Sequence, residues 1–362
     1  MDYLITAAER ASYKRCRRQW DLGSVHRRSL EPVEPEPADV AVAVRDALAV
    51  YYYPGMWDWQ SAIVLPLVRK AFMRSIAEQP PSPERTRNLD IGTALLERYI
   101  EWAPSMDEFG PIRIDHEVEA IVPDLGEPGR GLYLPDGRRI VYTDRVDLLA
   151  IDVYDAYWVV RHQVVPDWQD IRTLLLDEEA VAACWAWEQT YIGMDVAGTI
   201  HNEIRVGLDD LGPPPPETAT GRPGRGGYPQ HEGSGGGRNV PQHQRQYGRP
   251  ELPAGTERVE QQTGGMIRRT RIRRTREEIH GMGALVAAEA LEMLNSEVAM
   301  YPSPGTHCPA CPFDAPCLTM CEGADPTLDL AARYRLRPVG PALKTRLGAA
   351  GGSRGGVVPP RP

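Results

Sequence analysis

The sequence has no long apolar run and almost no lysine. Its best candidate for a membrane-spanning segment, residues 39–53, is interrupted by Arg45 and Asp46, so it falls short of the roughly 18 consecutive apolar residues that a membrane helix requires. The N-terminal residues also lack the apolar centre of a signal peptide. We therefore expect a cytoplasmic protein without membrane contact. In that reducing compartment, closely spaced cysteines bind metals more often than they form disulfides.

Acidic residues outnumber basic ones by 50 to 41, which gives a formal net charge of −9. This balance excludes positive potential over the whole surface, but it permits local basic patches. A solvated charged surface is the simpler interpretation of each patch. Two patches stand out as candidates for binding phosphates. One surrounds Cys16, and the other has the alternation of a half-exposed strand; their residues are Lys14, Arg15, Arg17 and Arg18, and then Arg268, Arg269, Arg271 and Arg273.

Helix-like and strand-like patterns follow one another along the chain and predict an α/β fold. Thr275 and Glu278 have the capping-box pattern of a helix start, and Cys184 lies among apolar residues where a core position is expected. Helical spacing of apolar residues predicts helices at 6–22, 38–53, 60–76, 88–102, 174–191 and 275–300. Alternating or apolar runs predict strands at 112–121, 139–150, 156–165, 196–206 and 266–272.

Two segments contain too few apolar residues to offset the entropy cost of ordering the chain. Residues 211–265 are rich in Gly, Pro and Gln, and we expect a disordered insertion there. Residues 337–362 are expected to form a disordered tail. The remaining residues, 1–210 and 266–336, are long enough to build one domain with a sizeable core.

Four of the six cysteines are spaced as metal ligands. Cys308, Cys311 and Cys317 form a Cys-x2-Cys-x5-Cys pattern, and Cys16 lies far upstream. Thiolates at such spacing bind zinc or an iron–sulfur cluster, and a distant fourth ligand would join the two ends of the chain. Cys321 offers an alternative, because together with its three neighbours it would complete a local zinc site without Cys16.

The residues around these cysteines resemble the RecB-like and AddB-like branch of the PD-(D/E)XK nuclease superfamily, which includes CRISPR-associated members with a four-cysteine iron–sulfur cluster. In that branch one cysteine lies in a basic and aromatic N-terminal helix, as Cys16 does before Trp20, and three follow the nuclease core, as in Cys-Pro-x-Cys-Pro-Phe at residues 308–313. The resemblance spans residues 1–205 and 266–325. It implies a restriction-endonuclease-like mixed sheet flanked by helices, with a [4Fe–4S] cluster on Cys16, Cys308, Cys311 and Cys317.

The catalytic motif departs from this family's pattern. Its members hold Mg²⁺ or Mn²⁺ with an Asp and with a further Asp or Glu two residues before a Lys, and the ion activates water for phosphodiester cleavage. Asp144 matches the first of these positions. Arg161, however, stands at the second carboxylate position and Gln163 at that of the lysine, while Arg45 replaces the family's helical His.

Exchanging a metal-binding carboxylate for Arg161 places a positive charge where the cation binds, which costs several kcal/mol even at an effective dielectric of about 20. The three lysines of the chain, Lys14, Lys70 and Lys344, lie outside the motif. We expect Arg161 to pair with Asp144 and to fill the vacated metal site. In the simpler interpretation, Asp144 and its neighbour Asp147 only flank a solvent-facing strand, and the nearby acidic pair Glu117 and Glu119 is less favoured as a source of ligands.

The leading prediction is therefore a nucleic-acid-binding protein of nuclease descent with impaired catalysis. It would act on DNA ends or single strands in repair, recombination or phage-related DNA processing, with a helicase or nuclease subunit as partner. A first alternative is an active Mg²⁺- or Mn²⁺-dependent DNA exonuclease that uses Asp144. A second alternative is a protein-interaction module with a structural metal site and no affinity for nucleic acid.

Overall fold

The computed structural model describes residues 2–34, 39–206 and 258–337. Contacts within the chain define two compact units, one made of residues 1–11 and 36–298 and the other of residues 12–35 and 299–362. Most of the predicted disordered insertion and all but the first residue of the predicted tail lie outside the described residues. In the part of the chain that is described, no helix is long and apolar enough to cross a membrane.

The first unit is built on a seven-stranded mixed sheet, which confirms the predicted α/β class. The strand order is β1-β4-β5-β6-β8-β7, and β3 pairs antiparallel with β4. The pairs β1–β4 and β5–β6 are parallel, and the other pairs are antiparallel. The strands are β1 (Tyr3–Thr6), β3 (Phe109–Ile121), β4 (Ile140–Asp152), β5 (Tyr157–Val165), β6 (Val196–Arg205), β7 (Val259–Gly264) and β8 (Ile267–Arg273).

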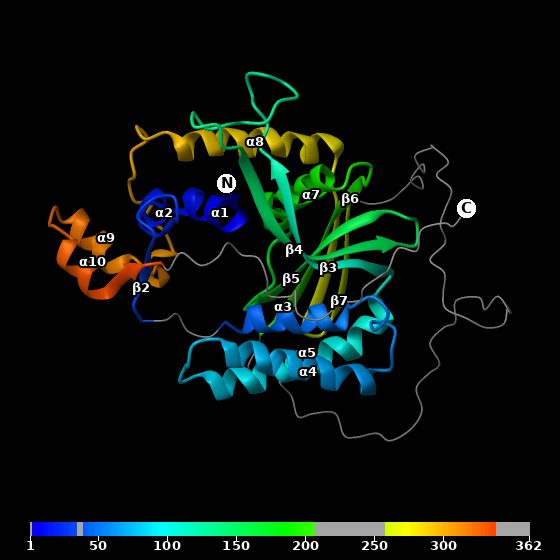
Figure 1. Ribbon diagram of the computed structural model, residues 1–362. Coiled ribbons are helices and arrows are strands. Elements are labelled where there is room, and N and C mark those ends of the chain that lie inside the picture. The colour runs from blue at the N-terminus through cyan, green and yellow to red at the C-terminus, as the bar shows by residue number, and fades with distance from the viewer. Residues whose placement is uncertain (1, 35–38, 207–257, 338–362) are drawn as a thin grey trace, which may run out of the picture. The chain divides into compact units, whose positions relative to one another are not determined.

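Helices cover both faces of this sheet (Figure 1). On one face α3 (Val40–Tyr51) contacts β3, β4 and β5, and it packs against α4 (Ser61–Glu78) and α5 (Arg85–Met106). On the other face α7 (Glu178–Thr190) contacts four strands and is covered by α8 (Arg276–Leu294). The short helix α6 (Ile171–Leu175) precedes α7.

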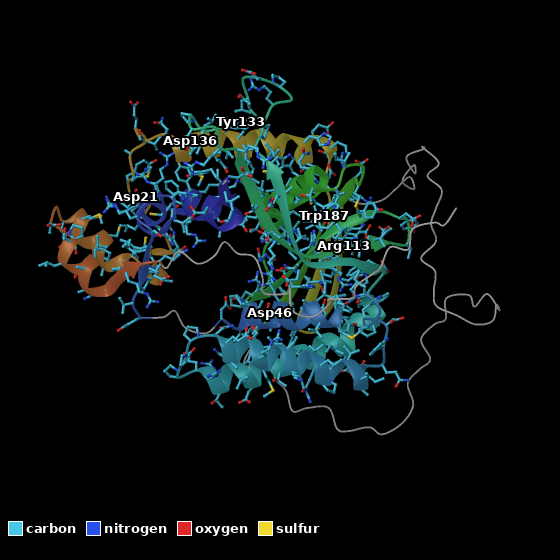
Figure 2. The ribbon with its side chains drawn as sticks, viewed as in Figure 1. Asp21, Asp46, Arg113, Tyr133, Asp136 and Trp187 are labelled. Atoms are coloured by element: carbon cyan, nitrogen blue, oxygen red, sulfur yellow. The ribbon has the colours of Figure 1, made fainter. Side chains whose placement is uncertain are left out.

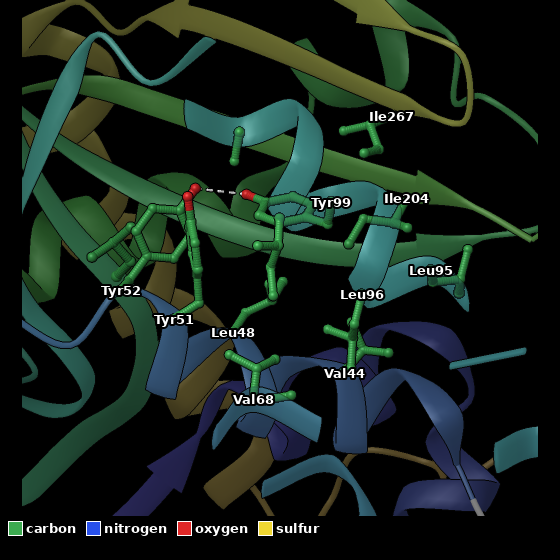
Figure 3. Close-up of a cluster of buried hydrophobic side chains, with 14 of the residues drawn as sticks. Val44, Leu48, Tyr51, Tyr52, Val68, Leu95, Leu96, Tyr99, Ile204 and Ile267 are labelled. Atoms are coloured by element: carbon green, nitrogen blue, oxygen red, sulfur yellow. Dashed lines mark hydrogen bonds between the residues drawn. The ribbon is translucent and has the colours of Figure 1, made fainter. Parts of the chain in front are cut away.

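One core cluster lies between α3, α4 and α5 and the sheet face that they cover. Leu48, Val68 and Leu96 are fully buried in it, and Figure 3 shows these side chains together with Tyr51, Tyr52 and Tyr99. The hydroxyl groups of Tyr52 and Tyr99 lie 2.7 Å apart inside this cluster. A buried phenol needs a hydrogen-bond partner, and each tyrosine supplies one to the other.

The second unit joins an N-terminal segment to a C-terminal one. Helix α1 (Ala7–Arg15) ends in this unit and is followed by α2 (Arg17–Gly23) and β2 (Leu30–Pro32). The C-terminal segment contains the 3₁₀ turn Cys308–Ala310, α9 (Asp314–Cys321), α10 (Thr327–Arg333) and β9 (Tyr334–Leu336). β2 and β9 pair antiparallel, and Leu22, Phe313 and Tyr334 form a buried cluster. Main-chain pairing and apolar packing thus hold this unit together.

The structure corrects several predicted boundaries. The helix expected at 6–22 is divided at Cys16, whose backbone is extended with φ −160° and ψ 111°. The helix expected at 174–191 is also divided, because Asp177 caps a new helix by accepting from the amide of Ala180. β7 lies inside the stretch 211–265 that was expected to lack structure, and β1 and β9 were not predicted. The capping box of Thr275 and Glu278 is confirmed.

Candidate functional site

The residues of the nuclease-like motif lie on two neighbouring central strands of the first unit. Asp144 belongs to β4 and Arg161 to β5, and these strands pair antiparallel with Leu148 opposite Val160. Helix α7 brings two further carboxylates, Asp177 and Glu179, to the guanidinium of Arg161. The sheet and one helix N-terminus therefore gather three acidic groups around one arginine.

The prediction that Arg161 forms its ion pair with Asp144 is wrong, because other carboxylates lie closer to its guanidinium. The guanidinium of Arg161 lies 3.4 Å from Asp177 and 3.2 Å from Glu179, and Asp144 contributes through a longer electrostatic interaction. Burial opposes the charge of Arg161, but the acidic groups, first Asp177 and then Asp144 and Glu179, together raise its pKa. The first carboxylates that Arg161 meets come from α7, which the sequence motif does not include.

Asp144 is partly buried among polar and charged groups. It accepts hydrogen bonds from the amide of Arg145 at 2.7 Å and from the hydroxyl of Tyr142 at 3.5 Å. Burial raises its pKa to about 6, and the charge of Arg161 only partly offsets this effect. Burial also raises the pKa of Asp147, which accepts the amide hydrogen of His162 at 2.8 Å.

A small cavity of about 140 Å³ opens beside the motif, between α3 and the strands β3 and β4. Its lining includes Arg45 and Asp147 but neither Asp144 nor Arg161. Asp115 forms an ion pair with Arg145 at this cavity, and Asp46 on α3 (Figure 2) accepts a hydrogen bond from Ser75 at 2.6 Å. The sequence predicted Asp144 as the metal-binding residue, whereas the aspartate of this motif that lines the cavity is Asp147.

Gln163, which was predicted to replace a catalytic lysine, takes part in a neutral hydrogen bond. Its side-chain oxygen accepts from the amide group of Gln169 at 3.2 Å. The backbone amide of Gln169 in turn donates to the buried carboxylate of Glu203 at 2.9 Å. Gln163 is thus held in place by the loop that follows β5.

The second basic patch is largely internal, and this corrects the expectation of a strand that offers arginines to phosphates. β8 lies between β6 and β7, and each of its four arginines is buried or partly buried. Arg269 is 3% exposed and forms an ion pair with Asp107 at 2.7 Å. Arg268 forms an ion pair with Glu203 at 2.6 Å. Both guanidinium groups are engaged inside the protein, which removes them from the candidate phosphate surface.

The two remaining arginines of β8 pack against an aromatic ring. Arg271 and Arg273 lie over the buried ring of Trp158, at 5.0 and 5.3 Å from its centroid. Arg271 also lies 3.8 Å from the carboxylate of Glu260. Such cation–π contacts stabilise a guanidinium within the fold. Arg271 and Arg273 therefore contribute to the packing of the sheet, which makes them weaker candidates for binding phosphate.

Arg269 is the centre of a buried polar network that the sequence did not reveal. It donates to Asn202 at 2.7 Å, and Asn202 donates to Tyr99 at 2.9 Å. His162 lies 3.2 Å from Asn202 and stacks on Tyr52. Burial, assisted by Arg269 and Arg45, lowers the pKa of His162 to about 3. The one sequence signal was the run of polar residues 201–203 within a largely apolar strand.

The first basic patch lies in the second unit and is more open. Lys14 and Arg15 are exposed on α1, and Arg17 lies over the rings of Tyr13 and Tyr301 at 5.2 and 5.3 Å. Arg18 instead donates to the sulfur atoms of two cysteines on α9. The N-terminal patch therefore combines exposed cations with an arginine held between aromatic rings.

The second unit gathers five of the six cysteines. The pKa of Cys311 is raised, chiefly by burial and then by the nearby thiols of Cys16, Cys317 and Cys308. Cys16 comes from the N-terminal segment, and it is buried near these C-terminal cysteines. The sixth cysteine, Cys184, is fully buried in α7 as predicted. The fold thus brings the four predicted ligands into one neighbourhood.

Each of these four sulfur atoms accepts a hydrogen bond. The amide of Ser303 donates to Cys16 at 3.5 Å, the amide of Gly305 to Cys308 at 3.4 Å, and Arg18 to Cys317 at 3.7 Å. The amide of Phe313 donates to Cys311. Even so, within residues 2–34, 39–206 and 258–337 no group of three or more His, Cys, Asp or Glu side chains is positioned to hold a metal ion. The predicted four-cysteine metal cluster is therefore not supported by the described geometry.

Comparison with known proteins adds little to this description. No family model matches the chain, and no curated protein matches it. One similar solved structure is described as "Crystal structure of SSO0001"; it is 12% identical, with a TM-score of 0.30, and the match covers 78% of this chain and 86% of that chain. At this TM-score the likeness carries no argument about fold or function.

Proposed function

We propose that this protein binds nucleic acid and descends from the RecB-like and AddB-like PD-(D/E)XK nucleases, with a restriction-endonuclease-like sheet whose cation site has been lost. One observation carries the proposal. Arg161 stands at the position of a metal-binding carboxylate and forms ion pairs with Asp177 and Glu179. Its guanidinium supplies the positive charge that a divalent cation would otherwise bring to these acidic groups.

Electrostatics explains why such a site resists Mg²⁺. A cation that approaches Asp144 also meets the positive charge of Arg161, whose pKa is raised so that it stays protonated. Repulsion between charges within contact distance costs several kcal/mol at an effective dielectric of about 20. In addition, Asp144 is ionised only in part near pH 6, which weakens the remaining ligand. Both effects disfavour metal-dependent cleavage.

The nucleic-acid partner is proposed from the N-terminal patch. Lys14 and Arg15 are exposed, and Arg17 between Tyr13 and Tyr301 offers a guanidinium held in place by aromatic rings. Phosphate contacts from such cations dominate affinity for nucleic acids and make it depend on salt. The net charge of −9 opposes DNA binding over the chain as a whole, so attraction must come from a local basic patch such as this one.

We propose further that Cys16, Cys308, Cys311 and Cys317 hold an iron–sulfur cluster, with zinc as the alternative. Two features favour these thiols: they share one neighbourhood, and each sulfur receives an N–H donor. Hydrogen bonds to sulfur are among the interactions that tune protein-bound clusters. A cluster also separates its thiolates more widely than a single ion does, because each thiolate binds a different iron atom. Its chemical role would be structural, as a link between the two chain segments of the second unit.

DNA binding is tested by fluorescence polarisation with labelled single-stranded and duplex DNA over a range of salt concentrations. We expect binding that weakens steeply with salt, and a slope smaller by about one for each phosphate contact removed. The double variant Lys14→Gln/Arg15→Gln should bind more weakly with a shallower slope. Its matched control, Lys70→Gln/Arg74→Gln, removes the same charge from exposed positions of α4 and should bind as the parent does.

Cleavage is tested with the same labelled DNA in the presence of Mg²⁺ or Mn²⁺. We expect no products from the parent protein. Cleavage that disappears in Asp144→Ala would overturn the proposal in favour of an active exonuclease. Absence of any salt-dependent binding would overturn it in favour of a protein-interaction module.

A further inference from the structure

We propose that Cys317 and Cys321 form a dithiol that peroxides oxidise to a disulfide, with Arg18 as the residue that positions and assists the thiols. The two cysteines are separated by one turn of α9, so their side chains lie on the same helix surface. Residues four apart in an α-helix have Cβ atoms about 5–6 Å apart, more than the roughly 3.5–4.5 Å of a disulfide, so the bond requires the last turn of α9 to shift. Cys321 is the last residue of α9, where the backbone can adjust most easily.

Arg18 connects the two sulfur atoms. Its Nη1 atom lies 3.2 Å from Sγ of Cys321 and 3.7 Å from Sγ of Cys317. The two thiols also interact with each other. One guanidinium thus places positive charge beside both reacting atoms, and a positive neighbour is the common feature of oxidisable cysteines.

The solvent exposure of the two cysteines indicates which thiol reacts first. Cys321 is exposed, whereas Cys317 is partly buried and Cys184 is fully buried. A peroxide therefore reaches Cys321 first. Unlike Cys16, Cys308 and Cys311, Cys321 has no place in the proposed cluster, so its thiol remains available whether or not a metal is bound.

The reaction balances with a peroxide as the sole oxidant. The sulfur of Cys321 attacks one peroxide oxygen, the O–O bond breaks, and a sulfenic acid and one water form. The sulfur of Cys317 then attacks the sulfenic sulfur and releases the hydroxyl group as a second water. In sum, two thiols lose two hydrogen atoms, one S–S bond forms, and hydrogen peroxide is reduced to two waters.

This reaction uses the thiols of α9 and does not require DNA binding, whereas a bound cluster would hold the Cys317 thiolate and compete with disulfide formation. If Cys317 is also a cluster ligand, the disulfide removes one ligand and releases the cluster. Oxidation would then alter the second unit through two coupled events. The proposal can be tested on the full chain in both metal-loaded and metal-free form.

The experiment treats the full chain with one equivalent of hydrogen peroxide and maps its peptides by mass spectrometry. Cleavage before Asp314 and Asp325 yields a peptide of residues 314–324 whose only cysteines are Cys317 and Cys321. We expect this peptide to lose two hydrogen atoms in mass, and the loss to reverse with a thiol reductant. In Cys317→Ser, a sulfenic-acid trap should label Cys321.

Arg18 variants separate assistance by the guanidinium from simple proximity of the thiols. Arg18→Gln should slow disulfide formation by about ten-fold, the typical effect of one charge-assisted hydrogen bond. Arg18→Lys should restore part of the rate, and Arg74→Gln, which removes an exposed charge from α4, should leave it unchanged. Circular dichroism of each variant checks that α9 still forms. A disulfide that links Cys321 to Cys308 or to a second chain, or no disulfide at all, would overturn the proposal.

Discussion

The Nη1 atom of Arg161 lies 3.4 Å from Oδ1 of Asp177, the residue that also caps α7. One carboxylate therefore holds the start of a helix and neutralises an arginine on the central strand β5. Asp177 also lies 3.8 Å from His201, which is fully buried. The guanidinium of Arg161 thus forms part of the folded core of charges. Loss of this group should lower the stability of the protein as well as change any cation binding.

Replacement of Arg161 by Gln should destabilise the protein. It leaves the partly buried Asp177 and Glu179 without their cation, and because both remain partly exposed we expect a loss of about 2 kcal/mol in the free energy of unfolding. Urea denaturation followed by circular dichroism measures this loss. Arg74→Gln, at an exposed position, should change the value by less than about 0.5 kcal/mol.

Replacement of Asp144 by Asn should flatten the pH dependence of stability between pH 4 and 6. The pKa of Asp144 is about 6 in the folded protein against an ordinary value of 3.8, so the folded state binds the extra proton in this interval. Its contribution therefore falls as pH rises, and the total change is on the order of 3 kcal/mol. Denaturation at several pH values should show that Asp144→Asn gains stability relative to the parent as pH rises from 4 to 7.

His162 should act in the opposite direction. Its pKa is lowered from 6.5 to about 3, so the unfolded chain binds more protons between these values and stability is lost as pH falls below 6.5. The variant His162→Phe retains a ring on Tyr52, and its unfolding free energy should vary with pH by about 1.4 kcal/mol per unit less than the parent's in this range.

The buried pair of Arg269 and Asp107 should show strong coupling. Arg269→Met strands a carboxylate in the core and should cost about 3 to 5 kcal/mol. Adding Asp107→Asn should recover a large part of this loss, since no buried charge then remains. The four denaturation curves form a double-mutant cycle. Purely additive losses would mean that the two side chains do not interact.

Metal content distinguishes the cysteine hypotheses. We expect Cys16→Ala to lose bound iron and its visible absorbance, whereas Cys184→Ala should retain both. Loss of zinc in Cys321→Ser, with full metal content in Cys16→Ala, would indicate the local zinc site instead. Elemental analysis of protein purified without oxygen gives the answer for each variant.

The sequence alone determined the α/β class, most helices and strands, the buried position of Cys184 and the capping box of α8. These features depend on local spacing of apolar residues and on contacts between residues three or four apart, which a linear pattern records directly. The short strands β1 and β9 escaped notice, because their pairing partners β4 and β2 are remote in sequence.

The burial and the ion-pair partners of the charged residues were decided by the tertiary structure. The strand predicted at 266–272 is confirmed by β8, yet the sequence did not show that β7 would cover the free edge of β8 or that Asp107 would meet Arg269. Likewise the motif identified Arg161 as the intruding charge, and the fold supplied Asp177 and Glu179 as its partners. Periodicity reports which side of an element is apolar, whereas ion pairs depend on which distant segments meet, and that is decided only when the sheet and its helices pack together.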